Sequence, residues 1–396
     1  MLHLHFGPSP LALGLLLPAS LETGFDVAVI ARAGDINPKT FGRGGSAPGS
    51  RLTYHRVKWF EGPTEYAELP ENLRGAIESE TPMLITASLR KQIADRVDFA
   101  EAVLRVRPPG AETIVLACEN DPHSAYEEIR KVAEETGATM LKTVVNRMCV
   151  ALPRDDRRRR MVSAHPLGEW LIERPVEPSA LLDELAAAKE VEIVDDIDAR
   201  ENRKLWMVNG AHQALALMAR AGGHRTLRGA ARSPAVLARL AHIHSAMNEA
   251  LRRAHPELSD NLDYGVEHVV AYCEHKDGID RVLAAYRRAD LSTFLENLDV
   301  RLAAPARWCA RDGISVEPLL HVVETLERLV KNVDGFSDAK QLRRRRIEIS
   351  SERDERAVAA YQRMLAGWLP EDDVARRSQN LRKVLDEQAK AYSPTA

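Results

Sequence analysis

The sequence predicts an α/β N-terminal half built on a doubly wound parallel sheet, followed by an all-α C-terminal half. In the first half, short β-rich runs alternate with stretches long enough to form a helix, which is typical of parallel strands joined by crossover helices. From about residue 195 the chain is rich in Leu, Ala, Glu and Arg and has few β-branched clusters. We therefore expect two domains, residues 1–195 and residues 196–396.

Hydrophobic runs bounded by turn residues predict the strands of the first half. The four clearest are Leu2–Phe6, Phe25–Ala31, Met83–Ala87 and Thr113–Ala117. Met140–Val145 and Val191–Val194 are weaker candidates. Residues 40–51, rich in Gly, Ser and Arg, predict a loop or a β-hairpin insertion. In the second half, apolar residues at i, i+3 and i+4 predict helices over Pro234–Ala254, Gly265–Cys273 and Pro318–Val330.

Composition narrows the class of protein. The 396 residues include 55 Lys and Arg and 58 Asp and Glu, so the net charge of −3 argues against a polycationic nucleic-acid binder. No apolar run reaches the roughly 18 residues that a membrane span needs, and the N-terminus lacks the basic start of a signal peptide. The four cysteines form no CxxC pair, and the 13 histidines form no HExxH pattern. We expect a cytoplasmic protein without metal, nucleic-acid or membrane partner, either monomeric or weakly dimeric.

Two runs of arginine interrupt this balanced composition, at residues 157–160 and 343–346. Such runs are usually solvated surface, and that is the favoured interpretation. Contact with a phosphate or a nucleic acid is the alternative, although no aromatic residues are interleaved for base stacking.

The segment after the first strand lies where dinucleotide-binding folds carry the pattern G-x-G-x-x-G. Gly7 can make the tight turn, whereas Ser9 and Ala12 occupy the second and third glycine positions. With Pro10 and Leu11, these residues are candidate contacts for the pyrophosphate of a nucleotide. Serine adds bulk where the ligand approaches the backbone, so an ordinary strand–turn–helix connection is the alternative.

Arg32 follows the second strand directly, at or beside the position where an NAD site usually carries Asp or Glu for the ribose 2′-hydroxyl. A guanidinium suits a 2′-phosphate, because it can form charge-assisted hydrogen bonds to it. Arg32 therefore favours NADP over NAD if a dinucleotide binds, and a surface arginine is the alternative.

The pattern K-x4-N-x2-H is formed by Lys204, Asn209 and His212. At about 100° per residue, Asn209 lies about 140° and His212 about 80° from Lys204 around a helix, so all three share one broad face. An amine, an amide and an imidazole suit proton transfer at an alcohol or a carbonyl. An amphipathic helix with mixed polar residues is the alternative.

With this pattern, the sequence resembles the long-chain mannitol dehydrogenase family, and most of all its mannitol-1-phosphate 5-dehydrogenase branch. Further similar segments run in order from residue 5 to residue 306. They are His5-Phe6-Gly7, Ala117-Cys118-Glu119-Asn120, Val145-Asn146-Arg147, Glu169-Trp170, Gly223-His224-Arg225-Thr226-Leu227 and Arg301-Leu302-Ala303-Ala304-Pro305-Ala306.

The resemblance implies a Rossmann-type domain followed by a helical domain, and hydride transfer between a nicotinamide and a polyol or sugar phosphate. It implies Lys204 as the general acid/base, with Asn209 and His212 binding the reacting oxygen. Asn120 would lie beside both cofactor and substrate, although alone it also fits a helix cap. Asn146 and Arg147 would contact substrate.

The chain departs from this family in three places. First, the glycine turn carries Ser9 and Ala12. Second, the family has an aspartate before the arginine that matches Arg147, and this chain has Asn146 there. Third, the family has a basic segment before the one that matches Arg301–Ala306, and at the comparable place this chain has Tyr286–Asn297, where only Arg287 and Arg288 supply cations. Two other functions therefore stay open. One is a regulatory or binding protein on a retired dehydrogenase scaffold, and the other is a non-redox proton-transfer enzyme acting on a sugar-like substrate.

Overall fold

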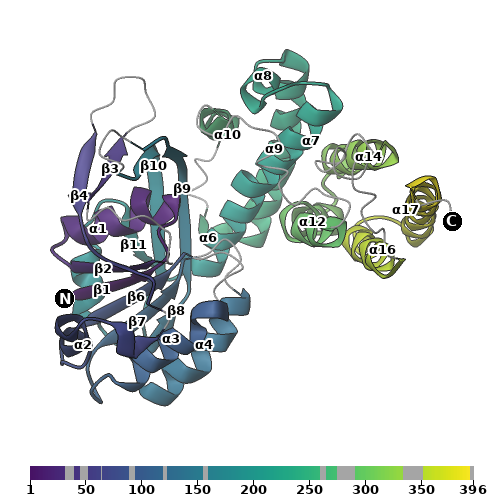
Figure 1. Ribbon diagram of the computed structural model, residues 1–396. Coiled ribbons are helices and arrows are strands. Elements are labelled where there is room, and N and C mark those ends of the chain that lie inside the picture. Colours follow the sequence, from purple (N-terminus) through teal and green to yellow (C-terminus); the bar gives the residue numbers. More distant parts are fainter. Residues whose placement is uncertain are drawn as a thin grey trace. The chain divides into compact units, whose positions relative to one another are not determined.

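The computed structural model describes residues 1–31, 40–44, 52–63, 65–88, 94–118, 123–154, 159–258, 265–273, 290–332 and 351–392. The chain divides into two compact units, Met1–Ile197 and Asp198–Ala396. The first unit contains the strands and the second is built from helices (Figure 1).

A six-stranded parallel sheet forms the centre of the first unit. In spatial order its strands are β5 (Lys58–Glu61), β2 (Asp26–Ala31), β1 (Leu2–Phe6), β6 (Met83–Ala87), β7 (Thr113–Ala117) and β8 (Thr139–Leu141). The chain builds outward from β1 to β2 and β5, and then returns to place β6 on the other side of β1. This order confirms the predicted doubly wound parallel sheet, and the four clearest strand predictions match its strands to within a residue.

Each face of this sheet is covered by a separate hydrophobic cluster. On one face, Leu2, Leu4 and Phe6 pack with α2 (Glu71–Ile77), α3 (Ala94–Arg105) and α4 (His123–Thr136). The other face packs against a π-helix, η1 (Ala12–Leu16), its continuation α1 (Leu17–Glu22), α5 (Ala180–Leu185) and a second sheet. Because side chains alternate along a strand, this second face also receives His3 and His5 of β1.

The second sheet is mixed. Its order is β11 (Val191–Val194), β10 (Met161–Glu173), β3 (Thr40–Gly44) and β4 (Thr53–Arg56), and β9 (Thr143–Leu152) also pairs with β10. β3 and β4 are antiparallel, as expected for a hairpin insertion. The sequence did not predict β10, because Pro166 and Gly168 interrupt its alternation where the ladder with β9 is irregular. The single strand expected at Met140–Val145 was wrong, since those residues divide between β8 and β9.

Helices make up the described part of the second unit. They are η4 (Lys204–Gly210), α7 (Ala211–Ala221), α8 (Leu227–Ala231), α9 (Pro234–Ala254), η5 (Pro256–Leu258), α10 (Val266–Cys273), α12 (Leu291–Leu298), η7 (Asp299–Ala303), α13 (Ala304–Arg311), α14 (Glu317–Lys331), α16 (Ser351–Leu365) and α17 (Glu371–Tyr392). α6 (Ile197–Arg203) leads into η4. The three helices predicted from spacing correspond to α9, α10 and α14, which confirms the all-α assignment. None of the helices in the described ranges is long and apolar enough to cross a bilayer.

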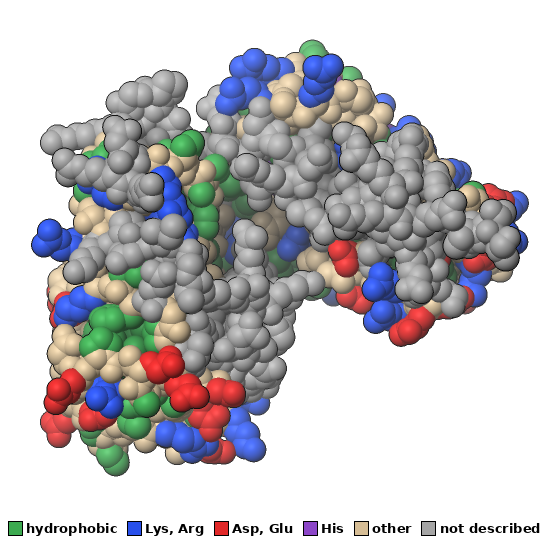
Figure 2. Space-filling view, viewed as in Figure 1, with side chains coloured by type: hydrophobic (Ala, Val, Ile, Leu, Met, Phe, Trp, Pro, Cys, Tyr) green, Lys and Arg blue, Asp and Glu red, His purple; other side chains and the backbone are tan. Residues whose placement is uncertain are grey.

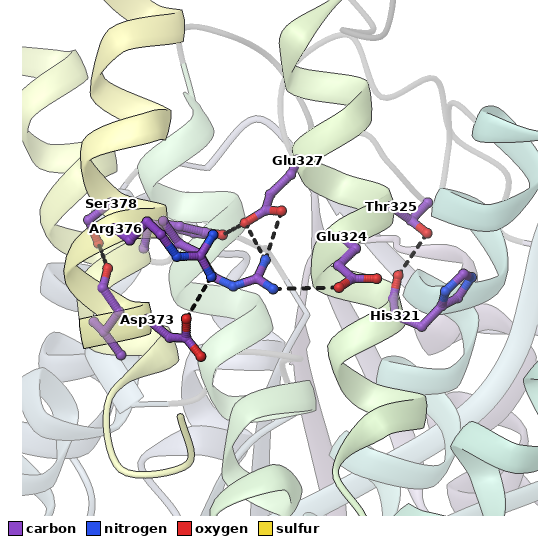
Figure 3. A network of polar contacts seen from close by, with 10 residues as sticks. His321, Glu324, Thr325, Glu327, Asp373, Arg376 and Ser378 are labelled. Carbon is purple, nitrogen blue, oxygen red and sulfur yellow. Dashed lines mark hydrogen bonds and ion pairs between the residues drawn. The ribbon is translucent and has the colours of Figure 1, made fainter. Parts of the chain in front are cut away.

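Two charged features mark the surface of this unit. Basic side chains gather over α8, where Arg225, Arg228 and Arg232 are exposed (Figure 2). Farther along the chain, Glu327 of α14 accepts hydrogen bonds from Tyr361 of α16, at 2.5 Å, and from Arg377 of α17, at 2.7 and 2.8 Å (Figure 3). One carboxylate therefore ties three helices together, beside a cavity of about 440 Å³ between α14 and α17.

Candidate active site

The turn after β1 lies at the switch point of the parallel sheet, between β2 and β6. Ligands of doubly wound sheets bind at such points, beyond the carboxyl ends of the strands. Gly7 has a φ of 95°, in the region that glycine adopts without strain, and its N–H donates to the carbonyl of Ile30 at 3.0 Å. Gly7 therefore directs the chain sharply from the strand into the following helix.

Ser9 caps that helix. Its hydroxyl accepts a hydrogen bond from the N–H of Ala12 at 3.1 Å, and its carbonyl accepts one from the N–H of Leu13 at 3.1 Å. Pro10 occupies the first helical position, where a missing N–H costs little. The serine in the second glycine position thus has a local structural role at the start of the helix.

The same bonds determine which backbone donors a phosphate could use. Pro8 and Pro10 have no N–H, and the N–H groups of Gly7, Ala12 and Leu13 are already bonded. Within this fully described turn, the N–H groups of Ser9 and Leu11 are left to face a ligand. A helix N-terminus also favours an anion. The turn therefore fits a nucleotide pyrophosphate, with fewer donors than a turn without prolines.

A chain of buried polar side chains lies beneath this turn. His3 and His5 both contact the hydroxyl of Thr86, at 2.6 and 2.5 Å, and His5 also contacts Ser88 at 2.9 Å. Ser88 in turn receives a hydrogen bond from Ser9 at 2.9 Å. Burial lowers the pKa of His5 to about 4 and holds the pKa of His3 well below its usual value, so both rings are neutral at pH 7. No sequence pattern predicted these hydrogen-bonded side chains, although two histidines alternating with Leu in a hydrophobic strand were the available signal.

The guanidinium of Arg160 also contacts the turn. Arg160 donates to the carbonyl of Pro8 at 3.4 Å, and its guanidinium carbon lies 5.8 Å from the centre of the Trp59 ring. Its neighbour Arg159 lies over Tyr54, at 4.1 Å from the ring centre. The described end of the 157–160 run therefore packs on aromatic rings, and its first two arginines lie outside the described residues.

Two of the predicted site residues, Arg32 and Asn120, lie outside the described residues, as do Arg287, Arg288 and the 343–346 run. The preference for NADP that Arg32 suggests and the contacts expected of Asn120 stay predictions.

Asn146 and Arg147 are buried in β9 of the second sheet. All three guanidinium nitrogens of Arg147 are engaged, with the carbonyls of His165 and Pro166 at 2.8 and 3.2 Å and with Glu190 at 3.1 Å. Burial is the largest single influence on the pKa of Glu190 and raises it, but the hydrogen bond from Arg147 and the positive charges of Arg147, Lys189 and Arg43 together outweigh burial, and the pKa of Glu190 is lowered. These contacts stabilise the irregular part of β10. The substrate contacts predicted for Asn146 and Arg147 stay untested.

Lys204, Asn209 and His212 all lie on one continuous helical stretch, η4 followed by α7. Lys204 and His212 are each 8% exposed, and Asn209 is half-buried. A π-helix bonds residue i to residue i+5, so Lys204 and Asn209, five residues apart, lie one above the other. The angles expected from a regular α-helix therefore do not hold here, and the two side chains are closer in direction than the sequence suggested.

Close packing accompanies this π-helix. A Cβ atom added to Gly210 would overlap the carbonyl oxygen of Arg301, which belongs to a second π-helix, η7. Only glycine lets the two backbones approach so closely. π-helical turns occur often at functional sites, so the packing of two of them at the candidate catalytic residues favours a functional role.

His212 stacks on Tyr272 of α10, with ring centroids 5.6 Å apart and an angle of 3° between the planes. Tyr272 is buried, so it restricts how the imidazole can turn. No group of three His, Cys, Asp or Glu side chains that could hold a metal ion occurs among the residues with described positions.

The glycine turn at the switch point of the parallel sheet thus belongs to the first unit, and Lys204, Asn209 and His212 lie on one helical stretch of the second. No model of a known protein family matches the sequence. Two curated relatives are both named mannitol-1-phosphate 5-dehydrogenase. The protein from Shouchella clausii is 23% identical over 379 residues, covering 86% of this chain and 91% of the relative. The protein from Lactiplantibacillus plantarum is 23% identical over 261 residues, covering 61% and 65%.

Solved structures share the fold. A D-sorbitol dehydrogenase in substrate-free form superposes with a TM-score of 0.64 at 13% identity, over 99% of this chain and 94% of that one. The mannitol 2-dehydrogenase of Pseudomonas fluorescens, solved with NAD and D-mannitol, gives 0.60 at 14% identity, over 98% and 92%. The chain is a distant and atypical relative of the mannitol-1-phosphate 5-dehydrogenases, as its sequence motifs predicted.

Proposed function

We propose that the protein is a nicotinamide-dependent oxidoreductase that interconverts a secondary alcohol and a ketone in a polyol, a sugar phosphate or a related hydroxy/keto metabolite. The observation that carries the proposal is that Lys204 and Asn209 lie five residues apart in one π-helix, with His212 three residues further along the same helical stretch. The similarity of the chain to a protein named mannitol-1-phosphate 5-dehydrogenase supports the same chemistry.

In this proposal, Lys204 removes the proton from the substrate hydroxyl on oxidation and returns it to the oxygen on reduction. Asn209 and His212 donate hydrogen bonds to that oxygen and stabilise the charge that develops on it. Burial of the lysine excludes bulk water from the proton transfer. The nicotinamide would supply or accept the hydride, and the N–H groups of Ser9 and Leu11, in the turn that Gly7 makes, would hold the pyrophosphate of the dinucleotide.

The substrate class follows from this chemistry and from the names of the relatives. Polyols, keto sugars and their phosphates all carry a carbon that can cycle between alcohol and ketone. Because the segment Tyr286–Asn297 departs from the basic pattern of the family, non-phosphorylated substrates belong in the same screen as phosphorylated ones.

The test is Lys204→Ala. We expect turnover to fall by at least roughly a hundredfold, since general acid–base catalysis contributes about that much, while nucleotide affinity stays within twofold. Lys383→Ala changes an exposed lysine of the same unit and should leave turnover unchanged. Normal turnover in Lys204→Ala would show that the assigned mechanism is wrong.

Cofactor identity is tested by parallel calorimetric titration with NADPH and NADH. We expect the tighter binding with NADPH, because Arg32 suits a 2′-phosphate. Equal binding would remove the argument from Arg32 and leave the dehydrogenase proposal in place. Binding of neither nucleotide would favour a regulatory protein on a retired scaffold, and turnover without any nicotinamide would favour non-redox proton transfer.

A further inference from the structure

We infer that Ser88 is a positioning residue for the cofactor turn: it holds the hydroxyl of Ser9 inward and so makes a serine compatible with nucleotide binding where glycine is typical. The inference rests on the proposed function, because it concerns the turn assigned to the nucleotide. Ser88 follows β6 directly and is buried beside the turn. No pattern in the sequence points to it.

The hydrogen-bonding capacity of Ser88 is fully used. A serine hydroxyl can donate one hydrogen bond and accept two. Ser88 donates to the carbonyl of Gly7 at 3.3 Å and accepts from the hydroxyl of Ser9 at 2.9 Å. Its contact with Nε2 of His5, at 2.9 Å, must then be one in which the ring donates.

Because His5 donates to Ser88, the donor and acceptor roles of the other hydrogen-bonded side chains are also determined. With its proton on Nε2, His5 presents a bare Nδ1, which accepts from the hydroxyl of Thr86. Thr86 then accepts from Nε2 of His3. Nδ1 of His3 is the bare nitrogen at the end of the chain, and within the described part of the molecule it has no hydrogen-bond partner. The hydroxyls of Thr86 and Ser88 therefore each have a definite orientation, and the donated hydrogen bonds run in one direction from His3 in the sheet to Ser88 beside the turn.

At the other end, the hydroxyl of Ser9 gives its hydrogen to Ser88 and accepts from the N–H of Ala12. Both bonds draw the side chain toward the helix and β6. The hydroxyl hydrogen is therefore unavailable to a phosphate, and the ligand must rely on the N–H groups of Ser9 and Leu11. Without Ser88, the hydroxyl of Ser9 would lose its acceptor. It would then rotate toward other acceptors, and one such orientation places it in the space that the pyrophosphate needs.

The experiment is a double-mutant cycle on nucleotide affinity, measured by calorimetry with the full chain and with NADPH or NADH, whichever binds more tightly. We expect Ser88→Ala to weaken binding about tenfold, as expected when a buried hydrogen-bonding group loses its partner. In the Ser9→Gly background, where no hydroxyl needs to be held, the same Ser88→Ala change should alter affinity by less than about twofold. Ser20→Ala is the matched control, because it removes the hydroxyl of another fully buried serine in the same unit, and it should leave affinity unchanged.

An equal loss from Ser88→Ala in both backgrounds, or no loss in either, would overturn the inference while leaving the proposed function intact. Absence of nucleotide binding in the unaltered protein would instead overturn the proposed function, and the inference with it. If Ser88→Ala does not fold, Ser88→Cys replaces the hydroxyl by a thiol, which is a weaker acceptor, and it should also weaken nucleotide binding in the presence of Ser9 but not in the Ser9→Gly background. Unchanged affinity in Ser88→Cys, or the same loss in both backgrounds, would then contradict the inference.

Discussion

The two histidines of β1 carry an energetic cost that depends on pH. Both are fully buried, and the hydrogen-bonded chain that they form is complete only when the His5 ring is neutral, because Nδ1 of His5 accepts from Thr86. Protonating His5 would place a charge in the sheet interior and give Nδ1 a hydrogen that competes with the hydroxyl of Thr86. The unfolded chain has no such restriction, so acid favours unfolding.

The pKa of His5 is about 4 in the folded protein and 6.5 for an unperturbed histidine. Between these values the unfolded state binds a proton that the folded state does not, so stability present above pH 6.5 is lost as the pH falls toward 4. We expect the free energy of unfolding to drop by about 3 kcal/mol across this window from His5 alone. Denaturant titrations at several pH values measure it. His5→Gln should flatten the slope, whereas His242→Gln, at an exposed position, should not. Identical slopes in the unaltered protein and His5→Gln would contradict this account.

At the scale of the element, the helix that carries the candidate residues Lys204, Asn209 and His212 shows what a sequence pattern can and cannot predict. The spacing of Lys204, Asn209 and His212 predicted a shared face. It could not predict the π-helix, because that geometry accompanies contact with η7, some ninety residues away in the chain. Likewise β1, β6 and β7 were predictable because each is a short hydrophobic run bounded by turn residues, whereas β10 escaped because Pro166 and Gly168 interrupt its pattern where the ladder with β9 is irregular.

Gly210 is the residue through which η4 and η7 approach, so Gly210→Ala should force them apart. We expect a loss of about 2 kcal/mol in the free energy of unfolding, typical of overpacking, and at least a tenfold fall in turnover because Lys204 and Asn209 move with the helix. Gly75→Ala is the matched control: it lies in a helix with no atom within 4 Å of the added Cβ, and it should stabilise the protein by about 0.5 kcal/mol. Full turnover in Gly210→Ala would show that the close packing does not set the catalytic geometry.

At the scale of the whole molecule, the candidate functions are distributed between the two compact units. The nucleotide turn and its buried polar chain belong to Met1–Ile197, whereas Lys204, Asn209 and His212 belong to Asp198–Ala396. The change in composition predicted an α/β half followed by a helical half. It could not predict that the first unit contains a second sheet, because that sheet is assembled from segments far apart in the sequence, residues 40–56 and 143–194.

This distribution predicts that stability of the helical unit can be changed without changing nucleotide affinity. Glu327→Ala removes the carboxylate that joins α14, α16 and α17, and it leaves Arg377, whose side chain is 12% exposed, without its bidentate partner. We expect the free energy of unfolding to fall by about 2 kcal/mol, as for the loss of hydrogen bonds to a charged group. Glu352→Ala, at an exposed carboxylate of α16, should have little effect.

Denaturant titration measures the loss of stability. Calorimetry should give an NADPH affinity within twofold of the unaltered protein for both variants, because the proposed nucleotide turn draws its contacts from the first unit. A marked loss of affinity in Glu327→Ala would mean that the nucleotide site depends on the helical unit.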